Sequence, residues 1–390
     1  MTTTVPADRS TPKRRWQDQF SRHASFVGPI LALVVLVLIF SALAGSSFLT
    51  GSNLRNMASQ VSVLAIMATG LTFVLLLGQI DLSVANVAAF AGVAMATFFS
   101  GKTFGLFVFG SASFPASSLI ALLLPLVLAG VLGWVSSLLI NRAGIPSFVA
   151  TLAIYEVASG WALYWSQGNT LYSLPPAVKT LGGGSLGGIP TIVVSAVVVM
   201  VLADVVLRRT QFGRTVYMIG ANREAALLSG VPVQRVVRSV FVLSAVLSAL
   251  AGMLNVGRLG SAQAETGADL LLPAIAAVVL GGTSLFGGVG GMRNTLIGLL
   301  IYGVLDNGLD QLDVDLLLKP YIRGLFLILA LVLNVVAMRA TSRAQHHDAE
   351  ADGAAAPPPD TPADTTTPEG GPPDRRETAA TAAPGSPGTV

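Results

Sequence analysis

Long apolar runs alternate with short polar stretches over most of the chain. A helix crosses the hydrocarbon core of a bilayer with about 20 mostly apolar residues and satisfies its own backbone hydrogen bonds. Ten runs approach or reach this length, so the pattern predicts an all-α, polytopic membrane protein of about ten transmembrane helices. The predicted spans are 27–45, 56–77, 84–99, 118–140, 146–165, 190–207, 236–257, 270–285, 294–311 and 321–338.

The composition supports a membrane protein and excludes several kinds of site. Of the 390 residues, 53% are hydrophobic and 11% are charged, whereas roughly one quarter of a soluble domain is charged. The chain has no Cys, which excludes disulfides and thiolate metal sites. Its His residues, His23, His346 and His347, lie outside the predicted spans. We therefore expect no metal site in the membrane region.

Lys and Arg gather in the loops on one side of the predicted spans. Cationic loops of membrane proteins collect on the cytoplasmic side. If both termini are cytoplasmic, most of the cationic loop residues fall inside, and Lys179, Arg258 and Lys319 fall outside. The pattern therefore predicts a multi-pass protein of the cell membrane with both termini in the cytoplasm.

The two ends of the chain differ from the region between them. Residues 1–25 are basic, and we expect a cytoplasmic N-terminal segment there. Residues 26–340 hold all the predicted spans and form the expected transmembrane domain. Residues 341–390 are acidic and rich in Pro, Ala and Thr, a composition that buries too little apolar area to fold. We therefore predict a disordered cytoplasmic tail.

Two apolar stretches are interrupted by glycine in a similar way. VLLLGQIDLSV (74–84) and AVVLGGTSLFG (277–287) align with Gly78 on Gly281, Asp81 on Ser284 and Leu82 on Leu285. Paired interrupted helices in the two halves of a transporter point to its pathway. The similarity therefore predicts an internal repeat with interrupted helices, and a chance match between glycine-rich apolar strings remains the alternative.

Polar residues inside apolar stretches are candidates for the translocation path. A carboxylate near the middle of a span costs about 3 kcal/mol on insertion scales, so it usually faces a partner or a watery cavity. Asp81 and Ser83 have a second explanation, because either side chain could cap the helix that begins at Val84. The predicted path residues are Asp81, Ser83, Glu156, Ser284 and Asn307.

The stretch TQFGRTVYMIGANREAALLSGVPVQRVV (210–237) is polar although it separates two apolar spans. Asn222 can cap a helix over 223–228, Gly230 supplies a left-handed stop, and Pro232 prevents its continuation. A helix this short is unstable alone in water. We therefore predict a cytoplasmic docking helix for another protein, with Ala225, Ala226 and Leu228 as one small apolar face.

The stretch ATFFSGKT (96–103) partly matches a phosphate-binding loop. A true phosphate loop follows a strand and precedes a helix, with glycines that let the backbone approach phosphate. Here the stretch follows an apolar span and lacks the first Gly, so we interpret it as a chance match. The sequence thus indicates no ATPase on this chain.

Five stretches, taken in order, resemble the permease subunits of bacterial ribose/xylose/galactose-type ABC importers. They cover most of residues 50–335. The stretches are GQIDLSVANVAAFAGV (78–93), IPSFVATLAIYEVASGWAL (145–163), TQFGRTVYMIGANREAALLSGV (210–231), GADLLLPAIAAVVLGGTSLFGGVGG (267–291) and GLLIYGVLDNGL (298–309).

The resemblance implies a bacterial plasma-membrane permease that imports a pentose or hexose sugar, with 26–340 as its permease domain. It implies a second permease copy or a paralogue, two ABC ATPase subunits and an extracytoplasmic sugar-binding protein as partners, and no nucleic acid. ATP and Mg would bind the ATPase chains, so no cofactor is expected on this chain. The implied ATPase-coupling residues are Gly220, Asn222, Arg223, Glu224, Ala225, Ala226 and Gly230.

The chain departs from the family pattern at a few positions. The family commonly reads Gly-Gly-Ile-Asp-Leu-Ser-Val-Gly where this chain has Gln79 and Ala85, and Glu156 is not expected from the pattern. The identity of the cargo stays open, with an amino acid or a nucleoside as alternatives. An ion-coupled secondary transporter that uses Asp81, Glu156 or Asp306 is a further alternative.

Overall fold

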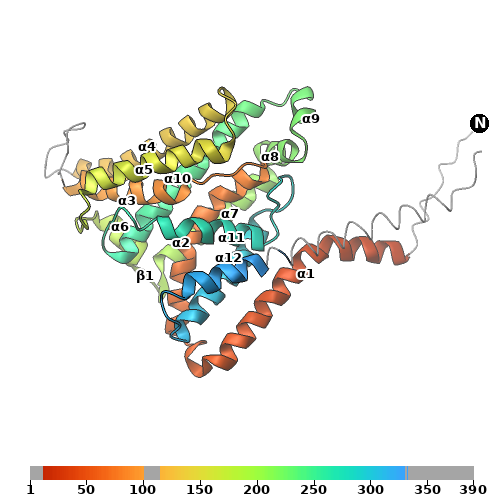
Figure 1. The fold of residues 1–390 in the computed structure, drawn as a ribbon, viewed down its shortest axis with the longest axis horizontal. Coiled ribbons are helices and arrows are strands. Elements are labelled where there is room, and N and C mark those ends of the chain that lie inside the picture. Colours follow the sequence, from red (N-terminus) through yellow and green to blue (C-terminus); the bar gives the residue numbers. More distant parts are fainter. Residues whose placement is uncertain (1–11, 101–114, 330–331, 333–390) are drawn as a thin grey trace, which may run out of the picture. The chain divides into compact units, whose positions relative to one another are not determined.

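The computed structural model describes residues 12–100, 115–329 and 332, and for 12–27, 115–117 and 268 it describes the backbone alone (Figure 1). Most of these residues are helical. The helices are α1 (Pro12–Leu43), α2 (Gly51–Leu76), α3 (Val84–Ser100), α4 (Pro115–Asn141), α5 (Ser147–Ser166), α6 (Pro176–Gly183), α7 (Thr191–Arg209), α8 (Gln211–Ala221), α9 (Arg223–Leu228), α10 (Val233–Leu259), α11 (Leu271–Leu280) and α12 (Met292–Gln311).

Four short elements and a final helical stretch complete the described fold. The 3₁₀ turns are η1 (Gly45–Ser47) and η2 (Ala268–Leu270). The strands β1 (Ser185–Leu186) and β2 (Ile189–Pro190) pair in a small antiparallel hairpin. After α12 the chain is helical again over 319–329.

Four helices in the described part of the chain are long and apolar enough to cross a bilayer. They are α2, residues 118–141 of α4, α7 and α10. The outer face of α7 exposes Val197, Val201 and Leu202, each more than half accessible. A continuous apolar face of this kind is stable in lipid and unfavourable in water. The all-α, polytopic membrane class is confirmed, and the number of ten spans stays a prediction.

Helices α2 and α10 form the centre of the bundle. Helix α10 packs against α2, α3, α4 and α6 (Figure 1). The contacts are close because small residues lie at the crossings. A Cβ added to Gly252 would lie 2.0 Å from the carbonyl oxygen of Ala88 on α3, and one added to Gly133 would lie 2.4 Å from that of Phe241. Small residues let membrane helices approach until backbones touch.

Three features of the helices differ from the sequence prediction. Helix α1 begins at Pro12, well before the predicted start at 27. The predicted span 270–285 is wrong in extent, because α11 covers ten residues, Leu271–Leu280, which is about 15 Å of helix. The chain leaves the helix at Gly282, whose φ is +97°. Helices α6 and α8 were not predicted, since neither has a long apolar run.

Several sequence predictions lie wholly or partly outside the described residues. The tail 341–390, the second part of the last predicted span and the end of the phosphate-loop-like stretch 96–103 are among them. The first part of that stretch forms the last turns of α3. A helix therefore leads into the stretch, where a phosphate-binding loop requires a strand.

The crossing of α3 and α10 gives a test of the fold. Gly252→Ala places a methyl group against the backbone of Ala88, and forcing the helices apart should cost about 1–3 kcal/mol. We expect the unfolding temperature of the purified protein in detergent to fall by several degrees. Gly160→Ala on α5 is the matched control, because a Cβ there meets nothing within 4 Å. Equal unfolding temperatures for the two variants would contradict this packing.

Candidate coupling and translocation site

Helix α2 ends in a glycine-terminated turn that breaks the membrane helix. Gly78 has a φ of +68°, and its N–H donates to the carbonyl oxygen of Leu75 at 2.9 Å. The N–H of Gln79 donates to the carbonyl oxygen of Val74 at 3.2 Å. This is a Schellman-type helix end, which satisfies the last carbonyl groups. The extended residues that follow lead into α3.

Helix α11 ends in the same way. The N–H of Gly282 donates to the carbonyl oxygen of Val279 at 2.9 Å, and that of Thr283 donates to Val278 at 3.2 Å. The helix-ending glycine is therefore Gly282. Gly281 is still helical, with a φ of −67°, so the backbone register is one residue later than the predicted match of Gly78 with Gly281. We call the non-helical residues 78–83 after α2 the first break and residues 282–291 after α11 the second break. Two helices that end alike before a non-helical break support an internal repeat.

Asp81 is held inside the first break by two serines. Its Oδ1 accepts from the N–H of Ser83 at 3.0 Å and from the Ser83 hydroxyl at 2.6 Å, while Oδ2 accepts from the Ser244 hydroxyl of α10 at 2.8 Å. Asp81 and Ser83 are both buried. The carboxylate therefore ties the break to α10. Its backbone donor is Ser83 rather than the first residues of α3, so the predicted capping differs in detail.

The backbone of the first break is also satisfied by α5. The N–H of Ile80 donates to the Ser147 hydroxyl at 3.1 Å, and that of Leu82 donates to the Thr151 hydroxyl at 3.0 Å. Buried backbone groups that have no water nearby require such partners. The break is thus a defined, hydrogen-bonded element between α5 and α10.

The length of α10 gives the depth of Asp81. Its partner Ser244 lies 11 residues from Val233 and 15 residues from Leu259. At 1.5 Å per residue, these separations are about 16 Å and 22 Å. A spanning helix of this length places Ser244 and Asp81 near the middle of the bilayer.

The other predicted path residues lie in three separate places. Glu156 is exposed in the middle of α5 and forms no ion pair with any described residue. The hydroxyl of Ser284 lies in the second break and accepts from the N–H of Phe286 at 3.1 Å. The amide of Asn307 on α12 pairs reciprocally with Asn53 on α2, at 2.7 and 2.8 Å. The structure therefore does not bring Asp81, Glu156, Ser284 and Asn307 into one site.

The pairing of Asn307 with Asn53 clamps two spans together. Asn53 also donates to the carbonyl oxygen of Phe48 at 2.7 Å and accepts from Gln311 at 2.8 Å. A second polar contact between α2 and α12 joins the hydroxyls of Thr72 and Thr295 at 2.7 Å. Sequence reasoning missed Asn53, Thr72, Thr295 and Ser244 as functional partners. For Thr72, Thr295 and Ser244 the only sequence signal is a polar side chain among apolar residues, and Asn53 lies in the polar stretch GSNLRN (51–56) before the predicted span.

The predicted docking helix is present with its predicted ends. Helix α9 is Arg223–Leu228, and the Asn222 side chain accepts from the N–H of Ala225 at 2.9 Å. Gly230 has a φ of +77° and stops the helix. The preceding helix α8 is capped in the same way by Thr210, which accepts from the N–H of Gly213 at 3.2 Å. Short-range capping therefore defines both helices.

The apolar face of α9 differs from the prediction. Ala226 is buried against the bundle, whereas Ala225 is exposed, and Leu228 is 90% exposed. Leu227 is 52% exposed beside it. The three predicted residues therefore do not form one face: Ala226 anchors α9, and Leu227 with Leu228 makes an outward apolar surface. Arg223 and Glu224 are exposed at its start.

Helix α8 meets both breaks at one point, which we call the three-way junction and define by Leu76, Gly220 and Gly288. The N–H of Gly288 donates to the carbonyl oxygen of Leu76 at 2.9 Å. A Cβ added to Gly220 would lie 1.8 Å from that oxygen and 2.6 Å from the nitrogen of Gly288. Only glycine leaves room for this contact. Three segments that are distant in sequence thus touch through their backbones.

Tyr217 of α8 reinforces the junction. Its hydroxyl donates to the carbonyl oxygen of Gly290 at 2.9 Å. Burial raises the pKa of the Tyr217 phenol above its ordinary value of 10.0. The hydroxyl therefore stays protonated at neutral pH and remains a donor to the second break.

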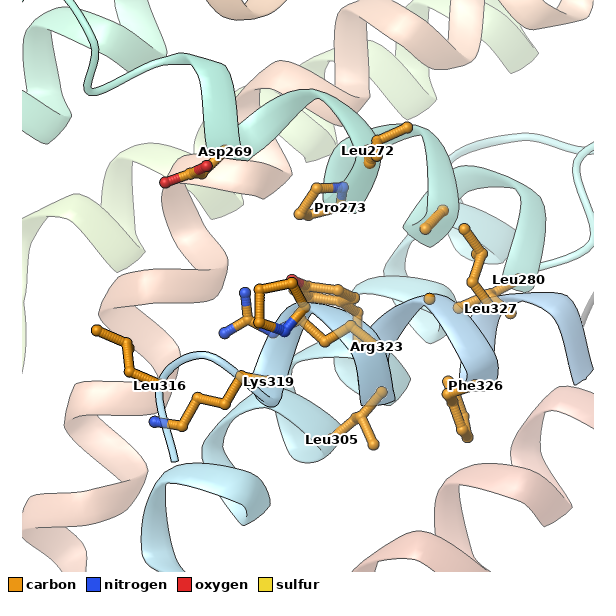
Figure 2. Close-up of a pocket in the computed structure, with 14 residues that line it drawn as sticks. Asp269, Leu272, Pro273, Leu280, Leu305, Leu316, Lys319, Arg323, Phe326 and Leu327 are labelled. Carbon is orange, nitrogen blue, oxygen red and sulfur yellow. The ribbon is translucent and has the colours of Figure 1, made fainter. Parts of the chain in front are cut away.

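A cavity of about 410 Å³ lies apart from the breaks, between α11, α12 and the helix over 319–329 (Figure 2). Most of its lining is apolar and includes Leu272, Leu305 and Phe326. Ion pairs join the last helix to α12 beside it, between Arg323 and Asp306 and between Lys319 and Asp310. None of the predicted path residues lines this cavity.

The Asp81 cluster gives a direct test of the first break. Asp81→Ala leaves the Ser83 N–H and two serine hydroxyls without their acceptor, and each unsatisfied buried group costs about 1–3 kcal/mol. We expect normal insertion, a lower unfolding temperature and a larger loss of solute uptake than of protein level. Asp81→Asn keeps one acceptor oxygen and should retain more of both properties. Unchanged uptake by the alanine variant would make Asp81 dispensable.

Known proteins that are similar to this chain are transport permeases by name. The profile of the family described as branched-chain amino acid transport system / permease component matches residues 53–333. The ribose import permease protein RbsC of Bacillus subtilis is 39% identical over 310 residues, covering 79% of this chain and 92% of that protein. The RbsC of Escherichia coli K12 is 35% identical over 309 residues, covering 78% and 92%.

A third relative is named for a different cargo. The L-arabinose ABC transporter permease protein AraH of Azospirillum brasilense is 34% identical over 305 residues, covering 78% of this chain and 86% of that protein. The comparison with solved structures found no match. The long sequence matches, together with the apolar spans, show a multi-pass membrane transport protein. The chain belongs to the branched-chain amino acid transport system / permease component family.

Proposed function

We propose that this chain is the membrane-spanning subunit of an ATP-driven importer that carries a pentose or hexose sugar into the cell. The main support for coupling to an ATPase is α9, a capped and outward-facing helix that directly follows the three-way junction in the chain. The cargo class is supported by relatives whose names specify ribose and L-arabinose. The family description names amino acids, which remain the second candidate cargo.

The proposed orientation places both termini, α8 and α9 in the cytoplasm. The segment from Arg208 to Arg238 is the most cationic loop region between the spans and contains Arg209, Arg214, Arg223 and Arg235. Cationic loops remain cytoplasmic during insertion. The hairpin of β1 and β2 then lies outside.

In this proposal α9 docks into a separate ABC ATPase subunit. The exposed surface offers Leu227 and Leu228 as apolar contacts and Arg223 and Glu224 as polar contacts. ATP and Mg bind the ATPase, and this chain contributes no cofactor site. Nucleotide-driven movement of the ATPase displaces α9. The displacement biases the permease between two states.

The three-way junction provides the route from α9 to the membrane. Asn222 links α9 to α8, and Gly220 of α8 lies in backbone contact with Leu76 and Gly288. Movement of α8 therefore displaces the end of α2 and the loop after α11 together. In the proposed cycle this opens or closes the path between the breaks, for a sugar delivered by an extracytoplasmic binding protein. A second permease copy or a paralogue completes the path.

The candidate path residues differ in how directly their surroundings favour contact with the cargo. Glu156 is the strongest, because an exposed carboxylate in mid-span needs water, cargo or a facing subunit. Asp81 and Ser83 hydrogen-bond to each other in the first break, and Ser284 lies in the second break. Asn307 joins α12 to α2 through its pairing with Asn53.

The geometry disfavours the ion-coupled secondary transporter. Asp81 is enclosed by two serine hydroxyls, and Asp306 pairs with Arg323. A proton or sodium relay requires carboxylates that exchange partners along a watery route. Such a transporter would also leave the exposed apolar end of α9 without a purpose.

Purification of the tagged chain from its native membrane in mild detergent tests the proposal. We expect a phosphate-loop ATPase to co-purify in stoichiometric amount, identified by mass spectrometry. Leu228→Asp should remove most of the ATPase and abolish uptake while leaving folding unchanged, since this side chain is 90% exposed. Leu186→Asp in β1, which is 68% exposed, is the matched control and should retain the ATPase.

Two results would contradict the proposal. Recovery of the wild-type chain alone, in a detergent that keeps another ABC importer of the same membrane intact, would exclude an ATP-driven importer. Full ATPase binding by Leu228→Asp would move the docking surface away from α9.

A further inference from the structure

Residues 260–267 form a non-helical segment that turns back along α3 after α10 ends, and η2 follows it. Gly260 stops α10 with a φ of +74°. Ala262 then forms an isolated antiparallel bridge with Leu171, with N···O distances of 2.9 and 2.8 Å. Farther on, Gly267 packs on the first turns of α3, where an added Cβ would lie 2.1 Å from the carbonyl oxygen of Ala85.

The contacts of Gly267 place this segment inside the membrane. The Cβ of Ala89 also lies against Gly267, so the segment is level with Ala88, which touches Gly252 of α10. Gly252 is six residues from the midpoint of α10, which corresponds to about 9 Å. The hydrocarbon core extends about 15 Å on each side of the bilayer centre. Gly267 therefore lies at hydrocarbon depth.

Irregular backbone occurs at this depth only where it is buried in protein or lines a water-filled cavity. One side of the segment meets the first condition. Ala262 and Gly267 are buried against the bundle. Between the segment, α3 and α10 lies a hollow of about 10 Å³, next to Asn255 and Thr266. That volume holds about one water molecule, so the segment packs closely on α3 and α10 here, with Gln263 also lining the hollow.

The other side of the segment carries polar side chains. Gln263, Glu265 and Asp269 are all exposed. Asp269 lies in η2, and it also lines the edge of the cavity shown in Figure 2, together with Leu272 and Pro273. A carboxylate that faces hydrocarbon is strongly unfavourable. The Glu265 carboxylate and the Gln263 amide on this irregular stretch, and the Asp269 carboxylate in η2, therefore need water rather than lipid.

We propose that Gln263, Glu265 and Asp269 line a water-filled entrance to the translocation path on the side away from α9. Carboxylate oxygens accept from neighbouring hydroxyls, and the amide of Gln263 both donates and accepts. This set suits an uncharged, hydroxyl-rich solute. The cargo contact rests on the proposed importer function, whereas the water-filled entrance follows from the depth and polarity of the segment.

The absence of Cys from the whole chain permits a site-specific test of water access. Gln263→Cys and Glu265→Cys are treated in intact cells with a membrane-impermeant methanethiosulfonate, and the remaining thiols are counted with a maleimide mass tag. Only the thiolate reacts, and an apolar environment suppresses it. Val201→Cys on the apolar face of α7 is the lipid-facing control, and Leu186→Cys in β1 is the water-facing control.

We expect both segment variants to react at rates close to that of Leu186→Cys and at least about tenfold faster than Val201→Cys. Rates as slow as Val201→Cys would overturn the entrance. Unreactive thiols that instead form a disulfide-linked dimer would assign the segment to a subunit interface and would also overturn it. The labelling requires neither cargo nor ATPase, so its outcome is independent of the co-purification experiment.

Uptake measurements test the contact with cargo. Ribose, L-arabinose and D-allose are supplied to cells that express Glu265→Ala or Glu265→Gln, with ATPase co-purification as the control for assembly. We expect the alanine variant to raise KM for the imported sugar several-fold and the glutamine variant to restore much of the loss. Unchanged KM in both variants, for a sugar that the wild type imports, would remove Glu265 from the cargo path.

Discussion

The architecture depends on a backbone contact that leaves no space for a side chain. At the three-way junction the carbonyl oxygen of Leu76 accepts from the N–H of Gly288, and Gly220 lies against both groups. Each segment comes from a different part of the chain: the end of α2, the end of α8 and the loop after α11. Because close-packed backbones do not deform continuously, a displacement of one segment is transmitted to the other two.

Because the membrane core holds no water, the backbone groups in every helix break need hydrogen-bond partners from nearby residues. In the first break, hydroxyls of α5 accept from the N–H groups of Ile80 and Leu82, and Asp81 accepts from Ser83. In the second, the Asn294 amide donates to the carbonyl oxygen of Gly281 at 3.0 Å. Polar side chains inside the spans therefore act mainly as hydrogen-bond partners of backbone groups. This explains why several candidate path residues are structural anchors.

Local features were predictable from the sequence, and long-range pairings were not. The ends of α9 follow from Asn222 and Gly230, because caps act within a few residues. The partnership of Asn53 with Asn307 joins residues 254 positions apart, and nothing in the local sequence around either asparagine specifies its partner. The short α11 was missed because hydropathy reports apolarity and not where a chain leaves its helix. The entrance segment was missed for the same reason.

The central claim is that α9 and the second break move as one body when the ATPase changes state. Leu228 and Phe286 are each 90% exposed, one on α9 and one in the second break, and the chain has no other thiol to label. Spin labels at Leu228→Cys and Phe286→Cys report their separation by electron–electron resonance in the assembled complex. The account predicts the same distance with and without ATP, while the distance from position 228 to position 186 changes. A change between positions 228 and 286 would contradict it.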